Sequence, residues 1–314
     1  MSDIVFVFPG QGSQTVGMGK EISEQFQEFK ETLQEASDSL GFNMERLCFE
    51  DPEAKLNLTE FTQPAILAIS IATLRVLQKR AGVNPTLVAG HSLGEYSALV
   101  SLGALDFSDA LRAVHFRGQA MQRAVPVGVG AMAAYLGNSG ELIPAICKEV
   151  STNDCKVEVV NFNSPGQLVL SGHKNAVAKV CEEVSARKLG RAKELPVSAP
   201  FHSSLMQPAA NEMAVFLSKI PLRAFSGKIV ANVDAKLHTA QSYSHETLVK
   251  QIANAVLWTQ SLAILQDAAP QSIWVEVGPG KVLQGLTKKT YETVNCLGTQ
   301  DLTSLKSTIE TLSK

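Results

Sequence analysis

The sequence has no long apolar run, no excess charge of either sign and no sign of a targeting segment. The longest strongly apolar stretch, residues 65–74, is too short to cross a bilayer. With 28 basic and 30 acidic residues the formal net charge is −2, so nothing global favours nucleic-acid binding. The start, MSDIVFVFPGQG, lacks the basic segment and cleavage site of a signal peptide, and we interpret Ile4–Phe8 as a buried strand. We therefore expect neither a membrane protein nor a nucleic-acid-binding protein.

Cysteine is scarce and scattered. The five cysteines show no CxxC spacing: Cys48, Cys147, Cys155, Cys181 and Cys296. An odd, dispersed set fits reduced thiols better than a disulfide framework or a zinc site. We therefore expect a cytoplasmic protein without a metal site.

What is present describes a compact globular enzyme. The chain has 314 residues, of which 45% are apolar and 18% charged. This length buries a sizeable core and suits one large domain with an insertion, or two moderate domains.

Two kinds of segment alternate along the chain. Short β-branched or apolar runs bounded by glycine predict strands at residues 4–8, 86–90, 130–137, 157–163, 167–172 and 273–278. Longer amphipathic stretches predict helices near residues 23–40, 63–81, 108–125, 176–188, 203–220 and 258–267. This alternation predicts an α/β fold with helices layered around a largely parallel sheet.

One segment breaks that alternation. Between residues 127 and 196 the order is strand, helix, strand, strand, helix, strand, with Asn163-Ser-Pro-Gly166 as the hairpin turn. This is the split βαβ pattern of a ferredoxin-like unit. Its position between two α/β portions predicts a small inserted subdomain, and a cleft between subdomains is a favoured ligand site.

The sharpest local signal is Gly90-His91-Ser92-Leu93-Gly94, which matches G-x-S-x-G. It follows an apolar strand and precedes a helical stretch at residues 95–102, which is the context of a nucleophile elbow. Such a turn exposes the serine hydroxyl and places the amide of Leu93 at a helix N-terminus, where developing negative charge is stabilised. The alternative is a buried glycine-rich turn whose serine only caps the helix.

A serine nucleophile needs a general base, and the chain has six histidines. His202 leads, because it precedes a helix and follows the small unit, where it can face the cleft. His91 adjoins the serine and suits local hydrogen bonding, and His115 lies inside a helix as a structural histidine. The other three lie in polar segments that we expect to be exposed: His173, His238 and His245. No acidic residue stands out as a third member, although a backbone carbonyl can equally accept from the histidine.

Three more positions have two readings each. Pro9-Gly10-Gln11-Gly12 is a glycine-lined turn after a strand, which fits a phosphate-binding loop and a plain turn equally well. Arg117 lies in an apolar-leaning helix, and the sequence alone favours a surface arginine or an internal ion pair. Phe201 either packs in the core or restricts the shape of a bound group.

Taken together, these motifs resemble the malonyl-CoA:acyl carrier protein transacylases. The resemblance rests on an ordered set of blocks: FPGQGSQ (8–14), TQPA (62–65), GHSLGE (90–95), RGQ (117–119), NSPGQ (163–167), FHS (201–203) and VGPG (277–280). A lone G-x-S-x-G is weak evidence, but this set covers most of the chain and is highly specific.

The resemblance implies a fold and a catalytic pair. The expected fold is an α/β-hydrolase-like large subdomain, residues 1–126 and 197–314, with an inserted ferredoxin-like small subdomain, residues 127–196. Ser92 matches the nucleophile that is acylated, and His202 matches its general base.

The resemblance also assigns supporting residues. Gln11 and Leu93 match the residues whose backbone amides form an oxyanion hole, and Arg117 matches the partner of the malonyl carboxylate. Gln251 matches the residue whose main-chain carbonyl orients the histidine. Two further residues are expected to contact substrate: His91 and Phe201. The sequence departs from many relatives at Ala255, where proline is usual, and Pro200 is one of several variants at its position.

The implied activity moves a malonyl group from malonyl-CoA to acyl carrier protein through a malonyl-serine, supplying fatty acid elongation. The implied partners are malonyl-CoA and acyl carrier protein, without cofactor, and we expect a monomer. An acidic carrier protein would meet basic residues at two clusters: Arg187, Lys188, Arg191 and Lys193, and Lys281, Lys288 and Lys289. The rival hypotheses are a thioesterase or esterase with the same elbow, and a non-catalytic docking subunit for the carrier protein.

Overall fold

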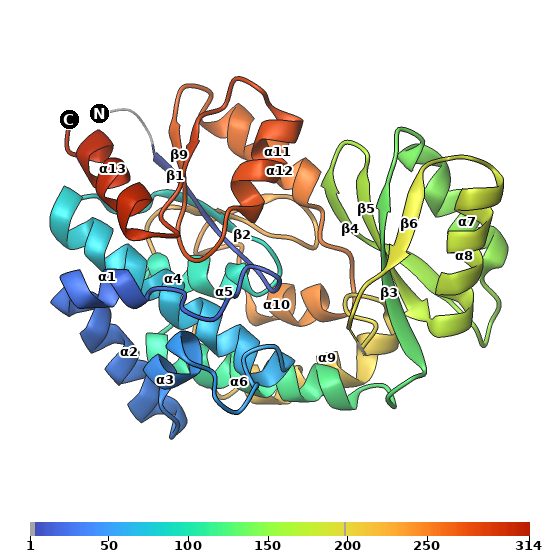
Figure 1. Ribbon diagram of the computed structural model, residues 1–314, viewed down its shortest axis with the longest axis horizontal. Coiled ribbons are helices and arrows are strands. Elements are labelled where there is room, and N and C mark those ends of the chain that lie inside the picture. Colours follow the sequence, from blue (N-terminus) through green and yellow to red (C-terminus); the bar gives the residue numbers. More distant parts are fainter. Residues whose placement is uncertain (1–3, 198) are drawn as a thin grey trace.

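The computed structural model describes residues 4–197 and 199–314, and its larger sheet has β1 (Ile4–Phe8) near the centre (Figure 1). The strand order is β10-β9-β1-β2-β7-β8. All pairings are parallel except the antiparallel β7–β8 pair at one edge. The other strands are β2 (Leu87–Gly90), β7 (Lys228–Val230), β8 (Leu237–His238), β9 (Ile273–Glu276) and β10 (Cys296–Leu297). The expected α/β fold with a largely parallel sheet is confirmed.

Helices cover both faces of this sheet because the side chains of β1 alternate between two buried clusters. Phe6 and Phe8 join the larger cluster, beneath α2 (Gln27–Leu40), α4 (Thr59–Ala81) and α6 (Phe107–Arg123). Val5 and Val7 join a second cluster with α11 (Trp258–Ala268) and α12 (Val282–Thr290). A strand that is apolar on both faces is typical of a parallel sheet covered on both sides.

Helix α4 is the core helix of this layer. Its 23 residues are long and apolar enough to cross a membrane, but 83% of its most apolar window is buried inside the protein. It begins at Thr59, four residues before the predicted start, so Pro64 lies inside the helix, beyond its first turn. Proline has no N–H to donate to the carbonyl of Glu60, one turn earlier. The Nδ1 atom of His115 lies 2.8 Å from that carbonyl oxygen and donates to it instead.

A second, four-stranded antiparallel sheet lies at the other end of the molecule (Figure 1). Its elements follow the predicted order: β3 (Gly130–Leu136), α7 (Ile143–Val150), β4 (Val157–Ser164), β5 (Gln167–His173), α8 (Lys174–Ala186) and β6 (Arg191–Glu194). The strand order β4-β5-β3-β6 is the one that a split βαβ unit produces. Its strands and the two helices enclose a third apolar cluster of their own.

Some predicted boundaries are wrong. The predicted helix 23–40 is two helices, α1 (Lys20–Gln25) and α2, because Phe26 adopts an extended backbone and packs its ring against the core. The predicted helix 203–220 is a 3₁₀ turn (Ser204–Met206) followed by α9 (Gln207–Leu217), which has a proline in its first turn. The remaining elements are α3 (Met44–Phe49), α5 (Gly94–Ser101), a 3₁₀ turn (Gly140–Leu142), α10 (His245–Ile252) and α13 (Leu302–Leu312).

Candidate active site

Ser92 stands on a sharp turn between β2 and α5. Its φ of 51° lies in the left-handed region, which is costly for a residue with a side chain. Gly90 and Gly94 allow this turn, because a Cβ at 90 would strike the backbone of Gly94 and a Cβ at 94 would strike the backbone of Phe8. The turn is also held by Asn232, whose Oδ1 accepts from the Ser92 amide at 2.6 Å and whose Nδ2 donates to the Gly90 carbonyl. The geometry is that of a nucleophile elbow.

His202 meets the hydroxyl of Ser92. The Ser92 Oγ and His202 Nε2 atoms are 2.7 Å apart. On the other side of the ring, Nδ1 lies 2.8 Å from the main-chain oxygen of Gln251, which can only accept. Nδ1 therefore carries the proton, and Nε2 is left free to accept the serine proton. His202 is itself in left-handed backbone, with a φ of 62°.

The histidine is held in its neutral form. It is only 5% exposed, and burial together with the nearby guanidinium of Arg117 lowers the pKa of His202 to about 3. Although Ala255 stands where the resemblance leads us to expect proline, the main-chain oxygen of Gln251 still lies 2.8 Å from the ring nitrogen Nδ1. A carbonyl in this position orients the imidazole without a third acidic residue.

Arg117, from α6, reaches the same hydroxyl from inside the protein. Its Nη2 donates to Ser92 Oγ at 3.2 Å and to Gln251 Oε1 at 2.9 Å, and its Nη1 donates to Gln63 Oε1 at 2.9 Å. The side chain is 1% exposed and forms no ion pair among the described residues. The reading favoured by the sequence alone, a surface arginine or an internal ion pair, is therefore wrong.

A buried guanidinium without a counter-charge is unfavourable. Among the described residues, all of its acceptors are neutral oxygens and its Nε has no partner. Burial lowers the pKa of Arg117 for the same reason. The arrangement is suited to receive an anionic group beside Ser92, because a carboxylate would supply both the missing charge and the missing acceptor.

Two backbone amides near the serine are available to a ligand. Within the described part of the chain, neither the Gln11 amide nor the Leu93 amide donates a hydrogen bond. Leu93 directly precedes α5, so its amide lies at the N-terminus of that helix, which is the positive end of the helix dipole. Gln11 lies on the turn after β1, where Gly10 packs against the backbone of His91 and leaves no room for a side chain.

These groups line a cavity of about 190 Å³. The larger sheet and its helices contribute Gln11, Gln63, His91, Ser92, Arg117 and Met121, and the loop before α9 contributes Leu195, Val197, Phe201 and His202. The antiparallel sheet contributes Met132, Asn161, Asn163 and Val169. The cavity therefore lies where the two sheets meet, as the inserted pattern predicts.

His91 and Phe201 occupy the wall of this cavity. His91 Nε2 lies 2.9 Å from Asn163 Oδ1, and its ring packs edge-on against Trp258. Burial lowers the pKa of His91, so the ring is neutral. Its contact with Asn163 connects the turn at Ser92 to β4. Phe201 is 9% exposed, packs against the core and also lines the cavity, so its restriction of branching on an acyl chain stays a prediction.

The remaining histidines lie elsewhere. His115 is structural, as predicted, since it bonds to Glu60 and Gln119. The expectation that the other three are exposed is wrong, because all are half-buried: His173, His238 and His245. His173, for example, accepts from the amide of Lys156, which closes the end of the β4–β5 hairpin.

Four residues of the site carry no recognised role in the sequence motifs. Asn232, Tyr243 and Glu95 form a buried network around Ser92 and Gln251, and Gln63 holds Arg117. Glu95 and Gln63 lie within the GHSLGE and TQPA blocks, so their membership of these motifs was the sequence signal that could have indicated a role in the site. Asn232 and Tyr243 lie in irregular segments without a motif.

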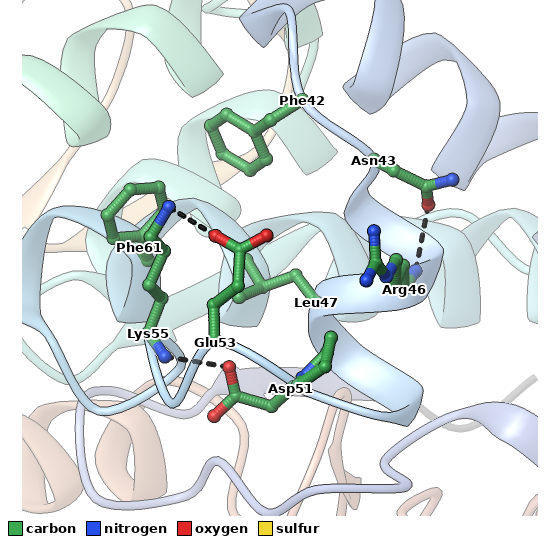
Figure 2. Close-up of a pocket in the computed structure, with 9 residues that line it drawn as sticks. Phe42, Asn43, Arg46, Leu47, Asp51, Glu53, Lys55 and Phe61 are labelled. Carbon is green, nitrogen blue, oxygen red and sulfur yellow. Dashed lines mark hydrogen bonds and ion pairs between the residues drawn. The ribbon is translucent and has the colours of Figure 1, made fainter.

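A second pocket, of about 120 Å³, shares no lining residue with the serine cavity (Figure 2). Apart from Arg46, its charged groups are already engaged. Lys55 forms an ion pair with Glu53, and the Asp51 carboxylate accepts from the backbone amides of Lys55 and Leu56. Phe42 and Phe61 close its apolar side. We interpret this pocket as a hollow in the tightly folded loop that precedes α4, rather than as a reaction site.

Among the described residues, no group of three or more histidine, cysteine or acidic side chains is arranged to hold a metal ion. The serine cavity brings together a strained serine, a neutral histidine, free amides and a buried arginine, and this arrangement suits acyl transfer through a serine. Consistent with this, a model of the acyl transferase domain family matches residues 5–308. The chain belongs to this acyl transferase family.

The similar proteins narrow the class. The chain is 44% identical over 310 residues to the malonyl CoA-acyl carrier protein transacylase of Escherichia coli strain K12, covering 99% of this chain and 100% of that protein. It is 40% identical to the transacylase of the same name from Bacillus subtilis, covering 100% of this chain and 98% of that one.

Solved structures agree. The crystal structure of the malonyl CoA-acyl carrier protein transacylase of Clostridium perfringens superposes with a TM-score of 0.94 at 41% identity, covering 99% of this chain and 97% of that one. A malonyl-transacylase in complex with a type II polyketide synthase acyl-carrier protein also superposes with a TM-score of 0.94, at 43% identity, covering 99% of this chain and 100% of that one.

Proposed function

We propose that this protein transfers a malonyl group from malonyl-CoA to the phosphopantetheine thiol of acyl carrier protein, through a malonyl ester on Ser92. The observation that carries the proposal is the meeting of three side chains at one oxygen. The hydroxyl of Ser92 lies 2.7 Å from His202 Nε2 and 3.2 Å from Arg117 Nη2. A base and a buried cation therefore act on the same nucleophile, which is what transfer of an anionic acyl group requires.

In the first half-reaction His202 accepts the Ser92 proton at Nε2 while Oγ attacks the thioester carbonyl. The amides of Gln11 and Leu93 stabilise the oxyanion, a contribution of about 3 kcal/mol for one such donor. The carbon–sulfur bond then breaks, the proton on Nε2 passes to the departing coenzyme A thiolate, and malonyl-Ser92 remains with its carboxylate on Arg117.

In the second half-reaction the carrier-protein thiol enters the same cavity. His202 accepts the thiol proton, the sulfur attacks the ester carbonyl, and the Ser92 oxygen leaves and regains the proton. One base serves both halves, and coenzyme A and the carrier protein occupy the site in turn. The cycle needs no group beyond the chain and its two substrates. The thioester product would supply fatty acid elongation.

Cavity size and charge favour this substrate over longer or neutral acyl groups. At about 190 Å³ the cavity is smaller than the sites of roughly 300–1,000 Å³ that hold drug-sized ligands, so it suits a short acyl group. Arg117 also separates the proposal from a thioesterase, because hydrolysis of neutral esters has no use for a buried guanidinium. We further propose that the protein is monomeric and cytoplasmic, and that Phe201 limits branching on the acyl chain.

Intact-protein mass measurement tests the proposal. Mixing with malonyl-CoA should add one malonyl group, mapped to the peptide that contains Ser92, and addition of acyl carrier protein should remove it as carrier thioester. Ser92→Ala should remain folded and gain no mass. A label on Ser13 or Ser203 would contradict the assignment of the nucleophile. Release of free malonate in place of carrier thioester would indicate a thioesterase, and no adduct at all would indicate a docking subunit.

A further inference from the structure

Glu95 is a fully buried carboxylate that the proposed chemistry does not use. It lies in the first turn of α5, three residues after Ser92, and is 0% exposed. Three groups donate to it: the Tyr243 hydroxyl to Oε1, the Asn232 amide to Oε2 at 3.0 Å, and Gln251 Nε2 to Oε2 at 2.8 Å. Among the described residues it forms no ion pair.

The surroundings of Glu95 determine which of its oxygens accepts. Burial raises the pKa of Glu95 and outweighs the contacts with Tyr243, Asn232 and Gln251, which lower it. The N–H groups of Asn232 and Gln251 can only donate, whereas the Tyr243 hydroxyl can donate or accept. Oε2 therefore accepts from Gln251 whether or not Oε1 carries a proton.

One of those donors also contacts Arg117. The Nε2 atom of the Gln251 side chain donates to Glu95 Oε2 and also, at 2.9 Å, to the Ser92 carbonyl oxygen. Its oxygen Oε1 accepts from Arg117 Nη2 at 2.9 Å. Reversing this amide would set its N–H groups against the guanidinium and its oxygen against the Glu95 carboxylate. Glu95 thus fixes which end of the amide faces Arg117.

We propose that Glu95 is a positioning residue for acyl selection, which holds the Gln251 amide with its oxygen toward Arg117 and so keeps the guanidinium on the Ser92 hydroxyl. The proposal rests on the proposed function, since it assumes that Arg117 receives the acyl carboxylate. Glu95 acts through Gln251 and touches neither substrate nor the reacting atoms. Loss of the carboxylate frees the amide to turn, and the guanidinium then has no fixed direction.

The test compares malonyl-CoA with acetyl-CoA, which lacks the second carboxylate. Acyl-enzyme formation is measured for wild type, Glu95→Ala and Glu95→Gln, with thermal unfolding as a check on folding. Glu95→Ala should lower kcat/KM for malonyl-CoA roughly 10- to 100-fold more than for acetyl-CoA, in line with the cost of leaving buried polar groups unpaired. Glu95→Gln should retain the wild-type preference for malonyl-CoA. Its side-chain oxygen can still accept from Gln251, and its side-chain nitrogen can donate to the Tyr243 oxygen.

Two further variants make the test specific. Tyr243→Phe removes a donor to Glu95 but keeps the Gln251 contact, so it should retain the preference. Gln251→Met removes the side-chain amide while keeping the main-chain carbonyl for His202, and it should reproduce the loss seen in Glu95→Ala without adding to it in the double variant. Should Glu95→Ala not fold, Glu95→Asp replaces it, because the shorter side chain withdraws the oxygens by one methylene.

The outcomes separate the two proposals. Equal losses for both acyl groups in Glu95→Ala, or no rescue by Glu95→Gln, would overturn the positioning role while leaving the proposed function intact. If wild type itself forms no malonyl ester on Ser92, the proposed function fails, and the positioning role fails with it.

Discussion

The two residues that we propose to react have backbone conformations that side chains normally avoid. Ser92 and His202 have φ values of 51° and 62°. Such conformations cost on the order of 1–3 kcal/mol each and persist only where neighbouring contacts enforce them. For Ser92 the contacts come from Asn232 and for His202 from the Gln251 carbonyl. These two neighbours therefore support the reaction without taking part in it.

Replacing Arg117 should change the acyl preference rather than abolish catalysis. In Arg117→Ala the malonyl carboxylate loses its buried partner, and transfer should weaken by roughly 2–5 kcal/mol, the usual cost of truncating one member of such a pair. Acetyl transfer should be kept or improved, because an acetyl group leaves the guanidinium unpaired in wild type. Rates of acyl-enzyme formation with the two thioesters measure the change.

Arg112→Ala is the matched control. Arg112 lies on the same helix but is half-exposed, with an ion pair to Asp109. Exposed pairs of this kind contribute roughly 0–1 kcal/mol, so neither rate should change much. Equal losses with both thioesters in Arg117→Ala would instead indicate a purely structural arginine.

The pH dependence of the free enzyme should lack the acid limb of an ordinary histidine. Burial and Arg117 lower the pKa of His202 to about 3, against roughly 6.5 for a free histidine. Only the neutral ring accepts the serine proton, so activity is lost only as pH falls toward the lowered value. Between about pH 5 and 8, kcat/KM for acyl-enzyme formation should therefore show no step due to His202.

The Arg117→Ala variant supplies a check on the sign. Removing the guanidinium removes a repulsion on the protonated ring, so the pKa of His202 should rise and the acid limb should move to higher pH. A wild-type limb near the ordinary histidine value would show that His202 is not a buried neutral base.

Only part of the site was within reach of the sequence. Ser92 was placed by its elbow motif and His202 by its position before a helix, since both signals are local. The burial of Arg117 and the contacts of Asn232 were not, because they depend on segments that lie far apart along the chain. Asn232, for instance, meets a serine 140 residues away.

At the scale of elements, long patterns were predicted better than their ends. The α4 pattern was recognised, yet its first turn was missed because Pro64 looks like a boundary. His115 on α6 makes the longer helix possible by donating to the carbonyl that Pro64 leaves free. The strands β7, β8 and β10 were missed because two or three residues are too few to show periodicity.

The basic face of α12 should steer the carrier protein. Lys281, Lys288 and Lys289 are exposed and form no ion pair among the described residues, whereas Arg187 of the other cluster is bonded to Glu149 and Glu183. Reversing the three lysines to glutamate should weaken carrier-protein use by about tenfold and flatten its salt dependence. Steady-state transfer at several salt concentrations measures both effects.

Two controls accompany that experiment. The malonyl-CoA half-reaction should be unchanged, because it does not involve the carrier protein. Reversal of Lys20 and Lys30, which lie on α1 and α2, should have little effect on either half. If transfer is indifferent both to salt and to reversal of the two basic clusters, the steering idea is wrong.

At the scale of the whole molecule, the layered architecture was the most predictable feature. Strands and helices alternate along much of the chain, and an α/β arrangement buries both faces of strands such as IVFVF. The division at residues 126–127 and 196–197 stays a prediction. Val160 and Phe162 of β4 exchange backbone hydrogen bonds with Val256, so the antiparallel sheet is also joined to the loop between α10 and α11.

The whole set of cysteines should be reduced and mostly unreactive. All five are free thiols, and burial raises the pKa of Cys147 to about 12 and also raises that of Cys48. A thiol reagent should label the native protein slowly, first at half-buried Cys155, and should find five thiols after denaturation without reductant. Fewer than five would reveal a disulfide.

The order of strands has a consequence for how the chain is made. β1 lies between β2 and β9, which are separated by more than 180 residues of sequence. While a ribosome is still synthesising the chain, one edge of IVFVF stays unpaired until residues 273–276 emerge. An apolar, uncharged edge strand is a template for aggregation. A truncated or stalled product that lacks β9 would therefore be a hazard to the cell, even with Ser92, His202 and Arg117 all present.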